Sequence, residues 1–128
     1  MGAERPRLVV ELQAALLRAA TEFGEEEAFV PHHARVLATA AALDYVLMLA
    51  TGTAGVRIPE RDAERAIREG FARGVDDLIA AATAIAELGT PAARAFARDC
   101  AKPLRAIMRV EALESDERSF AVIALANA

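Results

Sequence analysis

Proline and glycine divide this chain into long apolar segments, and this punctuation is the feature that most restricts its fold. The prolines stand where segments of periodic apolar residues begin, at Pro6, Pro31, Pro59 and Pro91. The glycines stand where such segments end, at Gly24, Gly52 and Gly89. Proline is tolerated in a first helical turn because its missing N–H has no intrahelical partner there, and glycine ends helices by adopting the left-handed conformation. The punctuation predicts four helices, over about residues 5–23, 31–51, 59–88 and 91–114.

The apolar residues within each segment recur three and four positions apart, which is typical of a helix with one buried face. The second segment is an example, with Val36, Ala40, Leu43, Leu47 and Ala50 on one line. We therefore predict an all-α fold, an antiparallel four-helix bundle that forms a single domain over residues 1–128.

The apolar stretch SFAVIALANA after Ser115 adds either a short C-terminal helix or an apolar tail. In a helix, one face would carry Phe120, Ile123, Ala124 and Asn127. A strand is the alternative, because ten residues do not separate the two periods. An apolar tail is unfavourable in water, so we expect it to pack on the bundle or on a neighbouring molecule.

Charge and composition narrow the possible partners. The formal net charge of −4 argues against nucleic acid, although a local basic stripe remains compatible with it. Lys102 is the single lysine beside many arginines, which suits a GC-rich bacterial genome. With five Phe, one Tyr and no Trp, many small contacts should hold the core together.

The lone Cys100 and the lengths of the apolar stretches indicate a cytoplasmic protein without a membrane partner. One cysteine forms no disulfide within the chain, and its position on the stripe of Phe96 and Leu104 predicts a buried, inert thiol. The start of the chain does not resemble a signal peptide. The longest apolar stretch, residues 36–50, is shorter than the roughly 20 residues of a spanning helix and has Asp44 in its middle.

Two adjacent histidines, His32 and His33, are candidate metal ligands. In a first helical turn they point about 100° apart, so they do not grip one ion as a pair four residues apart does. A site would need a carboxylate from the preceding loop, Glu25 to Glu27, with Glu27 the nearest in sequence. The alternative is a pair of histidines at the surface or at a subunit interface.

Asp44 stands alone among apolar residues, with no basic residue three or four positions away. It therefore meets an arginine from another helix, reaches solvent at the bundle edge, or keeps its proton. A ligand pocket is the functional alternative. We expect it where Pro103 bends or breaks the fourth helix, with Asp44, Tyr45, Met48 and Met108 as its lining.

Gly70 and Gly74 lie one turn apart in the third segment. Glycine inside a helix costs about 1 kcal/mol relative to alanine, so the pair indicates close approach of another backbone. The approach is either within the bundle or between subunits. With Phe120 and Ile123 of the last segment, these glycines are the predicted interface residues.

The motif inventory favours interaction over catalysis. The sequence has no phosphate-binding glycine loop, nucleophile elbow, cysteine–histidine cluster or Glu-x-x-His pair, and we predict no cofactor. We predict a non-enzymatic interaction, adaptor or assembly module that acts through helix faces as a homo-oligomer. The alternatives are a sensory bundle that binds a small molecule near Asp44 and Pro103, and a metal-dependent enzyme using His32 or His33 with Glu25 to Glu27.

Overall fold

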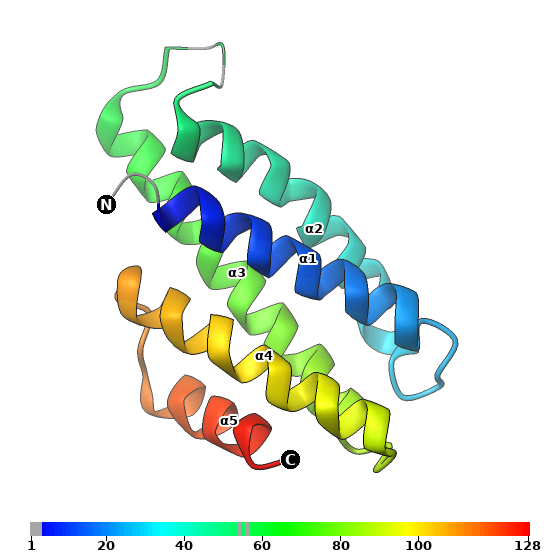
Figure 1. Ribbon diagram of the computed structural model, residues 1–128. Coiled ribbons are helices and arrows are strands. Elements are labelled where there is room, and N and C mark those ends of the chain that lie inside the picture. Colours follow the sequence, from blue (N-terminus) through cyan, green and yellow to red (C-terminus); the bar gives the residue numbers. More distant parts are fainter. Residues whose placement is uncertain (1–3, 54, 56) are drawn as a thin grey trace.

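The structure, a computed structural model, describes residues 4–53, 55 and 57–128. Five helices make up almost all of it (Figure 1). They are α1 (Glu4–Phe23), α2 (Val30–Thr51), α3 (Glu60–Ala86), α4 (Pro91–Val110) and α5 (Asp116–Ala126). The described residues contain no strand, which confirms the all-α prediction and decides between helix and strand for the last segment.

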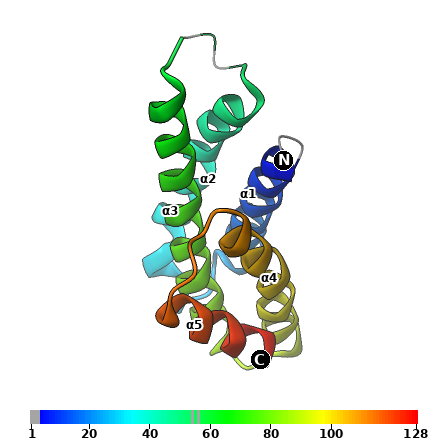
Figure 2. The ribbon, with the colours of Figure 1, turned by 90° about the vertical axis from the view of Figure 1, so that its left-hand side faces the viewer.

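The helices pack around one continuous apolar core. α1 contacts α2, α3 and α4, whereas α2 and α4 do not touch one another in the described residues. In Figure 1, α1 and α3 lie between α2 and α4. α5 lies against α3 and α4, as Figure 2 also shows. The bundle therefore has five members, and the predicted tail is its fifth helix rather than a loose end.

The helix ends follow the predicted punctuation in most places. Gly52 ends α2 in the left-handed conformation, with φ of 72°. The Thr90 side chain accepts a hydrogen bond from the Ala93 N–H at 3.1 Å and so caps the start of α4. Ser115 caps α5 in the same way by accepting from the Arg118 N–H at 3.2 Å. Short polar side chains at these positions satisfy N–H groups that a helix start leaves without partners.

The end of α4 differs from the prediction. The helix stops at Val110 rather than Glu114 because Ala112 adopts a left-handed conformation with φ of 54°. The Leu113 N–H then donates to the Met108 carbonyl at 2.9 Å, the bond that closes a Schellman turn. Alanine seldom takes this conformation, so no residue here marks the turn in the way that a glycine would.

The sequence also raised expectations about two features inside helices, Pro103 in α4 and the pair Gly70 and Gly74 in α3. α4 continues through Pro103, so the alternative of a broken helix is wrong. Gly70 and Gly74 face their own chain: a Cβ atom on Gly74 would lie 2.5 Å from the Leu12 side chain, and one on Gly70 would collide with Val46. Within the chain, the glycines therefore make room for side chains of α1 and α2 rather than for another backbone.

Candidate interaction surface

The four predicted pocket residues lie apart. Asp44, Tyr45 and Met48 are exposed on α2, and Met108 is buried in α4, a helix that α2 does not contact. Tyr45 lines a hollow of about 170 Å³ between α2 and α3, whereas Met108 lines a different hollow of about 260 Å³ between α4 and α5. Pro103 borders neither hollow. The predicted pocket is therefore not assembled.

Asp44 meets a glutamine instead of the expected arginine. The Gln13 side-chain amide donates to the Asp44 carboxylate at 2.7 Å and to the Ala40 carbonyl at 2.6 Å. The carboxylate remains exposed at the junction of α1 and α2. Asp44 thus reaches solvent at the bundle edge, which was one of its three predicted outcomes, and links two helices there.

His32 and His33 lie at the start of α2 beside a buried phenylalanine. Their rings are half-buried, with centroids 6.4 Å and 5.9 Å from that of Phe29. Glu25 to Glu27 are exposed in the loop before α2. In the described part of the chain, no three His, Cys, Asp or Glu side chains gather closely enough to hold a metal ion. Both histidines pack against Phe29, and neither has the ligand set that the metal hypothesis requires.

The most developed polar cluster, which the sequence did not predict, joins α1, α3 and the residue after α4. The Arg5 guanidinium donates to both carboxylate oxygens of Glu111, at 2.8 Å and 2.7 Å, and also pairs with Glu64. The Glu111 side chain is 1% exposed, so this bidentate pair satisfies a buried charge.

In this cluster the charge of Arg5 is balanced by the carboxylates of Glu64 and Glu111. Hydrogen bonds from Arg5 hold the pKa of Glu64 below its usual value, and the two carboxylates raise the pKa of Arg5. The cluster borders a hollow of about 450 Å³. Because its charged atoms bind one another, we assign it a structural role at the junction of three elements.

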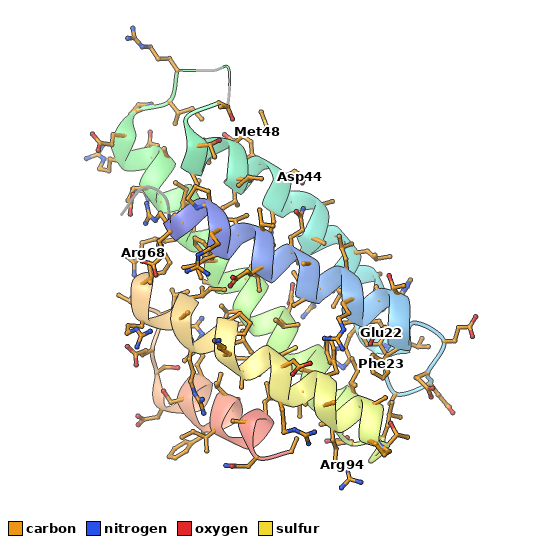
Figure 3. All side chains as sticks on the ribbon, in the orientation of Figure 1. Glu22, Phe23, Asp44, Met48, Arg68 and Arg94 are labelled. Atoms are coloured by element: carbon orange, nitrogen blue, oxygen red, sulfur yellow. The ribbon has the colours of Figure 1, made fainter. Side chains whose placement is uncertain are left out.

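α2 presents a long apolar face to solvent, and this is the most unusual surface of the molecule. We call it the outer face of α2; its members are Val30, Ala34, Leu37, Ala38, Ala41, Tyr45 and Met48, all exposed. At 100° per residue they fall within an arc of about 100°, and the arc contains no charged residue. Figure 3 labels Met48 on α2 and, one turn before it, Asp44, which lies at the edge of this face.

The outer face of α2 is more apolar than solvent-facing helices usually are. An 18-residue window of α2 has mean hydropathy 1.4, yet only 28% of that window is buried inside the bundle. By length and composition alone the helix could span a membrane, contrary to the sequence prediction, although it packs here on α1 and α3. Helices with this composition normally have both faces covered.

No protein-family model, curated protein or solved structure matches this chain. Its function is therefore inferred from its own surfaces.

Two further groups of exposed apolar side chains accompany the outer face of α2. Val10 and Leu17 of α1 are 49% and 45% exposed, and lie near Gln13, whose side chain reaches α2. Phe120 and Ile123 of α5 are 71% and 49% exposed. The predicted stripe of α5 is thus its outward face, and Val122 with Leu125 forms the buried one.

Proposed function

We propose that this protein is a non-enzymatic assembly module whose chains pair with one another through the outer face of α2. The observation that carries the proposal is the exposure of that face: a row of apolar side chains over about 27 Å of helix without a charge. Burying apolar surface of this kind stabilises an assembly by about 25 cal/mol per Å². Val10 and Leu17 of α1 are further exposed apolar side chains, near the contact between Gln13 and Asp44.

The shape of the face suits another helix. Ala34, Ala38 and Ala41 are small, so a partner helix can approach closely beside them. The larger side chains of Leu37 and Tyr45 fill the remaining space along the row. The spacing of four, three, four and three from Ala34 to Met48 is that of a helix–helix seam.

A second copy of the chain is the partner that fits this surface best. A surface without charge needs a partner surface that is also without charge, since desolvating an unpaired charge is unfavourable. The outer face of α2 in another copy meets that requirement, and a two-fold axis brings a patch against itself. Asp44 and Arg35 flank the face and remain at the solvated rim of such a pair. The lone buried thiol of Cys100 is in keeping with a cytoplasmic setting.

Sedimentation velocity over a range of protein concentrations tests the proposal, with Ala41→Arg as the disruptive variant. The wild type should sediment as a dimer, and the variant as a monomer, because two arginines would face one another in the centre of the pair. We expect the dissociation constant to rise at least about 100-fold.

Ala80→Arg is the matched control, since Ala80 is an exposed alanine on α3. It should leave the dimer intact, and circular dichroism should show both variants folded. A wild type that stays monomeric at every concentration, or a dimer that Ala41→Arg leaves unchanged, would overturn the proposal.

A further inference from the structure

α4 carries a straight row of cations on its outer side. We call it the α4 cation row; its members are Arg94, Arg98, Lys102, Arg105 and Arg109, all exposed. The spacing of four, four, three and four residues keeps them within an arc of about 80° and along about 22 Å of helix. Figure 3 shows the first of them, Arg94, pointing away from the bundle.

In the described part of the chain, no Asp or Glu side chain forms an ion pair with a member of the row. Arg98 donates to the main-chain oxygen of Ala128 at 2.9 Å. Lys102 and Arg109 line a groove of about 600 Å³ together with Glu4 and Glu11 of α1 and Asp99 of α4.

Carboxylates beside that groove already have cations of their own. Arg7 pairs with Glu4 and with Glu11, both on α1. Arg18 of α1 pairs with Asp99, the single acidic residue of α4. The α4 cation row therefore keeps its positive field toward solvent.

Such a concentration of positive charge is unexpected on this chain. The net charge of the protein is −4, while α4 has five basic residues and one acidic residue. Like charges four residues apart repel one another and destabilise a helix, so the row opposes folding without an external partner. An anionic partner would remove that repulsion.

α5 places exposed apolar side chains next to the row. Ile123 lines the same hollow as Arg105, Arg109 and the exposed Glu114, and Phe120 lies one turn before Ile123 on the outward face of α5. This combination of cations and exposed apolar side chains is typical of surfaces that lie on anionic membranes, where the cations meet headgroups and the apolar groups enter the interface.

We propose that the α4 cation row, with Phe120 and Ile123, binds the surface of a membrane that contains anionic lipids. A membrane is favoured over nucleic acid because a phosphate backbone offers no apolar environment to Phe120, which is 71% exposed. The row is also straight, as contact with a flat surface requires. This proposal replaces the expectation of no membrane partner, which rested on spanning segments, and it is independent of pairing through α2.

Vesicle flotation tests the proposal with the full chain. The protein should float with phosphatidylcholine vesicles that contain about 30% phosphatidylglycerol, not with pure phosphatidylcholine, and salt should weaken the binding. The double variant Arg98→Gln/Arg105→Gln should lower the partition coefficient about 30-fold, since each cation near an anionic surface contributes about fivefold. Phe120→Ser should weaken the binding without changing its dependence on salt.

Arg61→Gln/Arg65→Gln is the matched control, because it removes the same charge from exposed positions on α3. It should bind the anionic vesicles nearly as well as the wild type. Equal losses in both double variants would indicate a response to net charge alone and would overturn the proposal. So would a wild type that ignores anionic vesicles, or one that binds a 20-base-pair DNA duplex in their place.

Discussion

α2 and α4 are helices of nearly equal length, 22 and 20 residues, that bury one face each in the same core and differ in everything they show to solvent. α2 presents an apolar face without charge, whereas α4 presents five cations. Their inner faces use the same chemistry: Val36, Ala40 and Leu43 in α2, and Phe96, Cys100 and Leu104 in α4. The inner faces thus account for the fold, and the outer faces are where functions are to be sought.

The ends of the two helices differ as well. α4 begins at the Thr90 cap and is followed directly by Glu111, whose buried carboxylate binds Arg5. α2 begins at Phe29 without a side-chain cap and ends at an exposed glycine, Gly52. Polar side chains therefore act at both ends of α4, whereas the polar contacts of α2 lie along its middle, where Thr39 donates to the buried Asp77 of α3 and Gln13 of α1 donates to Asp44.

The largest effect should come from the polar anchor after α4. Arg5→Met leaves the carboxylate of Glu111 buried without its bidentate partner, and we expect the free energy of unfolding to fall by about 4 kcal/mol. Urea unfolding followed by circular dichroism measures the change. In Arg5→Met/Glu111→Leu much of the loss should be recovered, because no buried charge remains; a loss as large as in the single variant would contradict this account of the cluster.

Truncating a buried leucine should lower the free energy of unfolding by the same amount in α2 as in α4. Leu43→Ala and Leu104→Ala each open a cavity in the core, since these side chains are 1% and 0% exposed. Each should lower the free energy of unfolding by about 3 kcal/mol in the same urea titration. The exposed Leu37 is the matched control on α2, and Leu37→Ala should change the stability of the monomer by less than about 0.5 kcal/mol. A small effect at Leu43 would mean that α2 is not part of the core.

The reactivity of Cys100, the single thiol, should show how well the inner face of α4 is protected from solvent. Burial raises the pKa of Cys100 to about 12, so almost no thiolate exists near neutral pH. The native protein should react with a disulfide reagent such as DTNB at least about 100-fold more slowly than the urea-unfolded protein. Stopped-flow absorbance measures both rates, and comparable rates would show that the face opens readily.

The smallest effect should be the pH dependence of the Arg5–Glu64 pair. Arg5 lowers the pKa of Glu64 in the folded state, so the pair stabilises the protein above the unfolded-state pKa and loses its effect as the pH falls through the folded-state value. Because Glu64 is half exposed, the contribution should stay below about 1 kcal/mol. Glu64→Gln should be slightly less stable than the wild type at about pH 7, and the difference should shrink as the pH falls through the folded-state pKa of Glu64. A difference that does not depend on pH would point to another cause.

Local signals in the sequence predicted the helices well. Thr90 before Pro91, Ser115 and Gly52 mark helix ends by their own chemistry, which acts over a few residues and needs no tertiary information. The apolar spacing of α2 likewise identified Val36, Ala40 and Leu43 as its buried face. These features depend on neighbours in sequence, so the sequence suffices to find them.

Features that depend on distant residues were missed. Arg5 and Glu111 lie 106 positions apart, and nothing near either residue indicates the other. The proposed grouping of Asp44 with Met108 was wrong because it required contact between α2 and α4, which α1 and α3 keep apart. The α4 cation row was visible as a spacing in the sequence, yet its lack of carboxylate partners became clear only from the packing of α1 against α4.

Tyr45 provides the most direct measurement of the central claim, that the outer face of α2 is covered by a second copy. It is the sole tyrosine of a chain without tryptophan and lies on that face, one turn from Met48, so the intrinsic fluorescence of the protein reports this site alone. Acrylamide quenching should be strong in dilute protein and should fall several-fold as rising concentration drives association. Quenching that stays equally strong across the whole concentration range would contradict the account.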